Sequence, residues 1–423
     1  MTSAEVEVVG QDRPAPEETE PTGLAGLWHR GLENAKAGNL GILPIVLGEI
    51  FIVVFFSFKA TNFFTAENFI NIVIQMAGTT MLAYGIVFVL LLGEIDLSIS
   101  YVSGVGALVA AEFVLPGSGH VVPGGGLVAI AIALAVCAAI GAAQGSLVAF
   151  VGVPSFVVTL AGFLIWQGVI LRQLQARGSI GIQDRWVNYA ATYYFSPLAG
   201  WLIAAVVTGG YALFTLGAIA GKRRAGLTIQ NPVVVVLKIL GIAAASFGVV
   251  AICNHAVIIS QTQGLPLAGV IIVIFLVVLT YLAKRTTFGR HVYAVGGNAE
   301  AARRAGINVP RIRVLVFTLA GALAAVGGII LAANIQGVSS DAGGGTLLLN
   351  SIAAAVIGGT SLFGGRGEVS SAFIGAMVIA TVANGLDTAG YNPGTIYIVT
   401  GIILLLAVTL DTVARRLQVR AGR

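Results

Sequence analysis

The residues of this chain that could carry chemistry are few, and the sharpest group interrupts an apolar stretch. Glu94, Asp96 and Ser98 lie within residues 81–115, which are otherwise predominantly apolar. An ionisable side chain surrounded by lipid is expensive, so it is a functional hypothesis by default. Two interpretations stay open: Asp96 caps the amides that begin a following helix, or Glu94 and Asp96 line a polar cavity or hold a gate.

Other polar residues inside apolar stretches could line a path for a neutral polyol, which planar polar groups and aromatic rings can bind. The candidate pathway or gate residues are Gln75, Glu94, Asp96, Ser98, Asn350 and Asn384, with Gln336, Tyr84 and Trp166 as further polar or stacking surfaces. The competing interpretation is that each amide makes an interhelical hydrogen bond worth about 0.6 kcal/mol. Glu49, in the first apolar stretch, is expected to pair within the bundle.

No catalytic centre or metal site can be argued from these residues. Gly221-Lys222 is the only Gly-Lys pair, and Arg223 stands where a phosphate-binding loop needs Ser or Thr to hold magnesium. The four histidines are scattered, without a second ligand at metal spacing. We therefore expect a chain that is not an enzyme and that has no catalytic residue, no metal and no cofactor of its own.

Composition identifies the elements that must position the polar residues. Of 423 residues, 57% are hydrophobic and 10% are charged, whereas a soluble domain carries about 25% charged residues. This balance excludes a soluble enzyme, a nucleic-acid-binding protein and a disordered scaffold. The apolar runs are continuous rather than alternating, which favours membrane helices over a membrane barrel.

Twelve apolar runs approach the length of about 20 residues that crosses a bilayer. They cover residues 41–58, 69–92, 97–115, 127–151, 155–171, 198–220, 233–260, 265–283, 312–335, 347–362, 370–388 and 394–413. The sequence thus predicts an all-α polytopic bundle of about twelve spans. The run at 347–362 is the weakest, because it is short and follows Gly343-Gly344-Gly345. A re-entrant or broken helix is the alternative there.

Basic loops predict the orientation. Residues 284–311 carry six Lys or Arg against Glu300 alone, residues 222–224 read Lys-Arg-Arg, and residues 414–423 carry four Arg. With twelve spans all three fall on one side, which is the cytoplasmic side, and both termini lie there too. The loop at 172–197 carries three arginines on the outer side, against this bias.

The loop after the eighth run contains a predicted short helix. Asn298 is a favourable N-cap, Glu300 lies in the positive first turn, Arg303 and Arg304 lie in the negative last turn, and Gly306 ends the helix. Two helical turns are not stable alone in water. Either the headgroup surface or a partner protein must therefore support this helix.

At this loop the chain resembles a known family. Glu300-Ala301-Ala302 followed by Gly306 resembles the EAA coupling motif of ABC-importer permeases, a cytoplasmic helix that fits a cleft on the ATPase subunit. The neighbouring residues resemble the branch with ribose, galactose, arabinose and xylose permeases. Four blocks agree in order within residues 41–413: 94–98, 153–162, 289–298 and 352–365. The xylose permeases are the most similar, with two extra spans, here about 198–260. The acidic residue that the family carries before the Ile352 block is replaced here by Asn350-Ser351, so no role of that acid carries over.

The resemblance implies a permease subunit that couples ATP hydrolysis on a partner to the import of a monosaccharide, D-xylose or a related pentose. The coupling helix would comprise Asn298, Glu300, Ala301, Ala302, Arg303 and Gly306. The implied partners are a cytoplasmic ABC ATPase that holds ATP and magnesium, an extracytoplasmic sugar-binding protein, a second permease copy and membrane lipid, with no nucleic acid. The alternative is a proton-coupled secondary sugar transporter, in which Glu49, Glu94 or Asp387 titrates.

The implied domain organisation has three parts in the cell membrane. Residues 1–40 form a disordered acidic cytoplasmic tail, since they are rich in acids and prolines and cannot bury a core. Residues 41–413 form the transmembrane permease domain, in which 284–311 are the cytoplasmic coupling loop. Residues 414–423 form a basic cytoplasmic tail.

Overall fold

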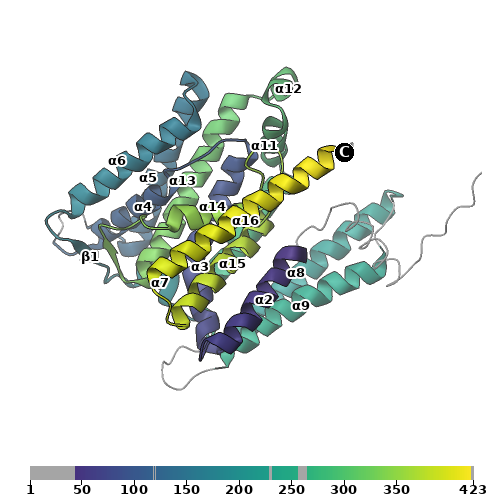
Figure 1. Cartoon of the computed structure of the whole chain (residues 1–423), viewed down its shortest axis with the longest axis horizontal. Coiled ribbons are helices and arrows are strands. Elements are labelled where there is room, and N and C mark those ends of the chain that lie inside the picture. The colour runs from purple at the N-terminus through teal and green to yellow at the C-terminus, as the bar shows by residue number, and fades with distance from the viewer. Residues whose placement is uncertain (1–42, 118, 120, 228–230, 256–263, 421–423) are drawn as a thin grey trace, which may run out of the picture.

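The computed structural model describes residues 43–117, 119, 121–227, 231–255 and 264–420, which are mostly helical (Figure 1). The helices are α2 (Leu43–Lys59), α3 (Ala66–Leu91), α4 (Ile99–Val114), α5 (Gly125–Ser146) with the π-helical turn η1 (Leu147–Val151), α6 (Ser155–Leu174), α7 (Arg185–Thr192), α8 (Pro197–Arg224), α9 (Pro232–Asn254), α10 (Leu267–Arg285), α11 (Thr287–Gly297), α12 (Ala299–Arg304), α13 (Val309–Asn334), α14 (Leu347–Ile357), α15 (Val369–Thr388) and α16 (Pro393–Arg420). The predicted tail at 1–40 lies outside the described residues.

Eight helices in the described part of the chain are long and apolar enough to cross a membrane: α3, α5 with η1, α6, α8, α9, α10, α13 and α15. Each of the twelve predicted runs coincides with one helix. The prediction of an all-α polytopic bundle is therefore confirmed as a fold class, and the number of twelve spans stays a prediction.

Two of the predicted runs form short helices. α14 has 11 residues and so rises about 16 Å, roughly half the thickness of a bilayer core. The run 347–362 is thus not one helix of spanning length, which agrees with its predicted alternative, a re-entrant or broken helix. α4 has 16 residues and begins only after the non-helical segment 92–98.

A small sheet of two short strands accompanies the helices. β1 (Ser179–Gly181) follows α6, β2 (Gly337–Ser339) follows α13, and the two pair antiparallel. The C-terminal ends of α6 and α13 therefore lie at the same end of the bundle. Figure 1 shows β1 at one end and α12 at the opposite end.

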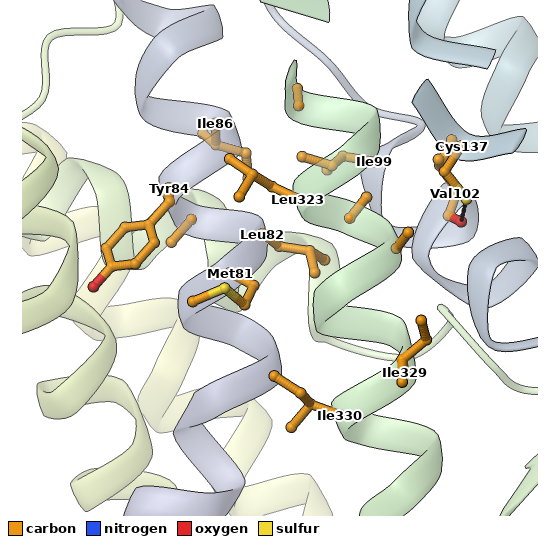
Figure 2. Close-up of a cluster of buried hydrophobic side chains, with 14 of the residues drawn as sticks. Met81, Leu82, Tyr84, Ile86, Ile99, Val102, Cys137, Leu323, Ile329 and Ile330 are labelled. Atoms are coloured by element: carbon orange, nitrogen blue, oxygen red, sulfur yellow. Dashed lines mark hydrogen bonds between the residues drawn. The ribbon is translucent and has the colours of Figure 1, made fainter. Parts of the chain in front are cut away.

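Helix α13 is the centre of the core and packs against α3, α4 and α5. Figure 2 shows Met81 and Leu82 of α3 beside Leu323 and Ile330 of α13, all almost fully buried. Lipid provides no hydrophobic drive between helices, so close approach at small residues must stabilise the packing.

Glycines allow α5 and α13 to approach each other closely. A Cβ at Gly141 would overlap the carbonyl of Phe317, and one at Gly145 would lie 2.8 Å from the Phe317 Cβ. The small-residue pair Gly141 and Gly145 therefore packs α5 onto α13.

The hairpin of α8 and α9 corresponds to the two extra spans and lies at the edge of the bundle (Figure 1). Few of its residues are buried. Its two helices are joined by a 2.8 Å hydrogen bond between Thr208 Oγ1 and Ser246 Oγ and by the stacked rings of Trp201 and Phe247. Most of the apolar surface of the hairpin is therefore left for lipid.

Candidate functional site

The predicted short helix is present as α12, at the exposed corner of the bundle. Asn298 Oδ1 accepts a hydrogen bond from the Ala301 amide at 2.9 Å, and Gly306 follows the helix with φ +85°. The Glu300 carboxylate lies 3.2 Å from Arg303 and 3.4 Å from Arg304. These capping and charge signals operate within one or two turns, which explains why the sequence was sufficient to predict them.

A second helix, which the sequence reasoning did not separate, carries α12. α11 begins at Thr286, whose Oγ1 accepts a hydrogen bond from the Gly289 amide at 3.2 Å. A Cβ at Gly289 would overlap the carbonyl of Ala283 at the end of α10. The signal that could have revealed α11 is this Thr cap followed by a glycine, immediately after the last turn of α10.

The α14–α15 loop, residues 358–368, is bound to α10, α11 and α3. The Tyr293 hydroxyl of α11 donates a 2.7 Å hydrogen bond to the Gly367 carbonyl. Lys284 Nζ of α10 lies 2.8 Å from Glu368 Oε2. The Gly365 amide donates a 2.9 Å hydrogen bond to the Leu91 carbonyl at the end of α3. Movement of α11 must therefore displace this loop or break these contacts.

The α14–α15 loop approaches its neighbours at the level of the backbone. Gly364 and Gly365 have φ of +86° and +70°, a conformation that favours glycine. A Cβ at Gly296 of α11 would overlap the Leu91 carbonyl and lie 2.8 Å from the Gly365 amide. At Gly296 the contact between α11, α3 and the loop is thus backbone to backbone.

Charge interactions preserve the contacts of α10 and α11 with the α14–α15 loop at neutral pH. Partial burial opposes ionisation of Glu368, but the hydrogen bond and the charge of Lys284, with a further bond from Ser370, hold the pKa of Glu368 below its usual range. Burial, and then the charge of Glu368, raise the pKa of Tyr293. Glu368 is therefore ionised and the Tyr293 hydroxyl keeps its proton, as both contacts require.

The polar residues of the α3–α4 loop form a second group at this end of the bundle. Asp96 Oδ1 accepts hydrogen bonds from the Ser98 amide at 2.9 Å and from the Ser98 hydroxyl at 2.7 Å. Glu94 Oε1 lies 2.9 Å from Arg313 Nε at the start of α13. Asp96 thus makes the bonds of a helix cap before α4, while Glu94 is held by an ion pair that the sequence did not indicate.

Asp96 also borders a small cavity. The cavity has a volume of about 150 Å³ and is lined by Ile86, Val89, Leu90, Ile95, Asp96, Ile352 and Leu362. Its wall is mostly apolar, so the carboxylate is its one charged group. Both interpretations of Asp96 therefore have a structural counterpart, and a cavity of this size fits only a few waters.

The remaining predicted residues lie elsewhere. Asn384 Nδ2 of α15 donates to Gln75 Oε1 of α3 at 3.4 Å, and the Thr381 hydroxyl one turn earlier donates to Glu49 Oε1 of α2 at 2.7 Å. Asn350 Nδ2 donates to Thr346 Oγ1 within α14 at 3.2 Å. The six predicted pathway residues therefore form three separate groups, and the structure does not bring them to one site.

A polytopic helical bundle, with a capped two-turn helix at an exposed corner and a rigid junction behind it, has the architecture of a membrane-transport subunit. Residues 68–408 match the family described as branched-chain amino acid transport system / permease component, and the chain belongs to this family. As the sequence predicts, it is a membrane permease subunit and not an enzyme.

Curated relatives match almost end to end. The xylose transport system permease protein XylH of Escherichia coli (strain K12) is 33% identical over 91% of this chain and 95% of its own length. XylH of Haemophilus influenzae is 33% identical over 89% of this chain and 97% of its own length. The ribose import permease protein RbsC of Escherichia coli (strain K12) is 31% identical over 86% and 92%. No solved structure gives a significant match.

Proposed function

We propose that this chain is the membrane-spanning subunit of an ABC importer for a monosaccharide, D-xylose or a related pentose. The family description names branched-chain amino acids, whereas the relatives that match almost end to end are xylose and ribose permeases. Agreement over nearly the whole length of both chains is the stronger guide to substrate. The sugar is therefore the preferred substrate class.

The observation that carries the coupling role is the junction between α11, α3 and the α14–α15 loop. A cytoplasmic ATPase subunit, holding ATP and magnesium, would dock on α12, whose Glu300, Arg303 and Arg304 side chains are exposed. Its closure on ATP would move α12 and α11. Since Tyr293 and Lys284 are bonded to the loop before α15, the displacement would reach α14 and α15. ATP binding would in this way shift the equilibrium between the outward-facing and inward-facing states of the pathway.

The same geometry supports twelve passes through the membrane with both termini in the cytoplasm. The C-terminal end of α4 lies near β1, because Glu112 pairs with Arg177, which precedes β1. The other end of α4 lies near the start of α13, because Glu94 in the α3–α4 loop pairs with Arg313. The chain thus passes between the two ends of the bundle by segment 92–98 plus α4. Segment 340–346 plus α14 would carry the chain back from the end with β2 to the end with the α14–α15 loop. Two short helices, each completed by irregular backbone, would keep the predicted parity.

The side that carries α12 is the cytoplasmic side in this proposal, because Lys284 and Arg285 end α10 there and Lys222, Arg223 and Arg224 end α8. Helix α16 runs toward the same end (Figure 1). An extracytoplasmic sugar-binding protein would deliver substrate at the opposite end. A second permease copy would complete the pathway, and lipid would surround the pair.

Co-purification tests this function. The tagged protein is extracted from its native membrane in mild detergent, and its companions are identified by mass spectrometry. An ABC ATPase subunit should co-purify, and Glu300→Lys should abolish this, because it reverses the charge in the first turn of α12. Glu300 pairs only with exposed arginines, so its replacement should leave the membrane protein folded.

Asp387→Lys is the matched control, since Asp387 is also an exposed acid but lies at the opposite end of α15 from Glu368. It should retain the ATPase. A chain that purifies alone in several detergents, and that takes up sugar in liposomes under a pH gradient, would instead identify a proton-coupled secondary sugar transporter.

A further inference from the structure

A cavity opens at the end of the bundle opposite α12. It has a volume of about 380 Å³ and is lined by Leu171, Arg172, Leu174, Gln175, Gly178 and Ser340. These residues come from the last turn of α6, the turn before β1 and the segment after β2. The volume falls in the range of small-molecule sites, about 300–1,000 Å³.

Further polar residues adjoin those that line this cavity. Gln167, Leu171 and Gln175 are spaced four residues apart on α6, so they share one helical face. The Gln167 side chain hydrogen-bonds with the Tyr101 hydroxyl of α4. Asp341 follows Ser340, and its charge acts on the same hydroxyl.

Aromatic surface lies beside these groups. The ring of Tyr101 packs edge-on against the ring of Phe163, with centroids 4.6 Å apart. Tyr101 is buried, so its ring and its hydroxyl are fixed by their neighbours. Amides, a hydroxyl and aromatic carbon of α4 and α6 thus lie near the carboxylate of Asp341, in the segment after β2.

The backbone that carries Ser340 and Asp341 is held in place by close packing. A Cβ at Gly104 of α4 would overlap the Ala342 carbonyl, and a Cβ at Gly343, with φ +80°, would overlap the Ser100 carbonyl. Irregular backbone within a membrane protein persists only where protein covers it or where it lines a cavity. Segment 340–346 fits that rule, because it packs on α4 and borders the cavity.

We propose that Tyr101, Gln167, Gln175 and Asp341, with Arg172 and Ser340 at the rim, form the site that receives the monosaccharide on the side opposite α12. The inference rests on the proposed function and names the residues that recognise the sugar. Glutamine side chains both donate and accept hydrogen bonds, and a carboxylate accepts from two hydroxyls. That combination suits a row of neutral hydroxyl groups, and Leu171 with Leu174 covers the apolar face of the sugar ring.

Uptake of D-xylose and of D-ribose by cells that carry the whole importer, together with ATPase activity in their membranes, tests the proposal. Gln175→Met should lower sugar transported per ATP hydrolysed about threefold to tenfold and change the ratio of D-xylose to D-ribose uptake. Gln173→Met is the matched control, because Gln173 is also exposed on the last turn of α6 but does not line the cavity. It should leave both quantities unchanged.

Asp341→Asn gives the second measurement, since it keeps the shape of the side chain and removes its charge. A fall of about tenfold in sugar per ATP, with the ATPase subunit still bound, is the expected result. If Gln175→Met and Asp341→Asn transport both sugars as well as Gln173→Met does, the proposed sugar site is refuted. Competition by L-leucine but not by D-xylose would overturn its sugar specificity. An unaltered importer that takes up neither sugar would refute the proposed function instead, which separates the two failures.

Discussion

The contact between Tyr293 and Gly367 gives the most direct test of how this permease transmits movement. Tyr293→Phe removes one hydroxyl that donates a 2.7 Å hydrogen bond to the Gly367 carbonyl and leaves the ring in place. A neutral hydrogen bond contributes about 0.5–1.5 kcal/mol. If that bond is made in only one of the two states of the pathway, the equilibrium between the states shifts about twofold to twelvefold.

The neighbouring ion pair between Lys284 and Glu368 gives a second test of the same contact. The Lys284 and Glu368 side chains are 44% and 47% exposed, so solvent screens their attraction, and such pairs contribute about 0.2–1 kcal/mol. Lys284→Met should therefore weaken coupling by at most about fivefold. Glu368→Gln on top of Lys284→Met should add little, because the pair is already broken.

The assay is sugar uptake per ATP hydrolysed in proteoliposomes that contain the complete importer. Tyr293→Phe should hydrolyse ATP at least as fast as the unaltered protein but transport less sugar for each ATP. Tyr281→Phe is the control, since Tyr281 is an exposed tyrosine on α10. A normal ratio in Tyr293→Phe, together with additive effects of the two ion-pair variants, would refute the view that the α14–α15 loop transmits movement.

Further predictions concern the same end of the bundle. Gly296→Ala should destabilise the detergent-solubilised protein by about 1–3 kcal/mol in thermal unfolding, because its methyl group would overlap the carbonyl at the end of α3. Gly297→Ala, whose Cβ meets nothing within 4 Å, should be tolerated, and equal losses from both changes would contradict the packing argument. Glu94→Gln should cost about 1–3 kcal/mol of stability, because it leaves the partly buried Arg313 without its anion, but uptake should remain independent of a pH gradient. A loss of proton-driven uptake in that variant would favour the rival carrier. The pKa of Glu368 lies below its ordinary value of 4.5, so its ion pair stabilises the fold above that pH and is lost as the pH falls through the lowered pKa. Thermal unfolding between pH 8 and 5.5 should therefore show no contribution from this carboxyl, and a titration inside that window that Glu368→Gln removes would contradict the assignment.

The fold class and the α12 helix could be predicted from the sequence because their causes are local. Long apolar runs leave a helix as the means of satisfying backbone hydrogen bonds in lipid. Asn298, Glu300 and Gly306 act within one helix of six residues. The two extra spans likewise appear as α8 and α9 near the predicted bounds.

The grouping of the candidate residues could not be predicted, because it depends on which distant segments meet. Gln75 and Asn384 do contact each other, but Glu94 is paired with Arg313, a residue that the sequence reasoning did not consider. Asn350 bonds only within its own helix turn. A polar residue in an apolar run indicates that a partner exists, yet not which helix supplies it.

The sequence by itself determined that this chain is a helical membrane protein with a short capped helix in a basic loop, since periodicity, caps and charge act over a few residues. The tertiary structure decided where the short helices α4 and α14 begin, each after a non-helical segment. It also decided that glycines at 364 and 365 meet Gly296, and that Tyr101 and Gln167 meet near Asp341. Those contacts join segments far apart in the chain, so they follow from how the helices pack and not from any local pattern.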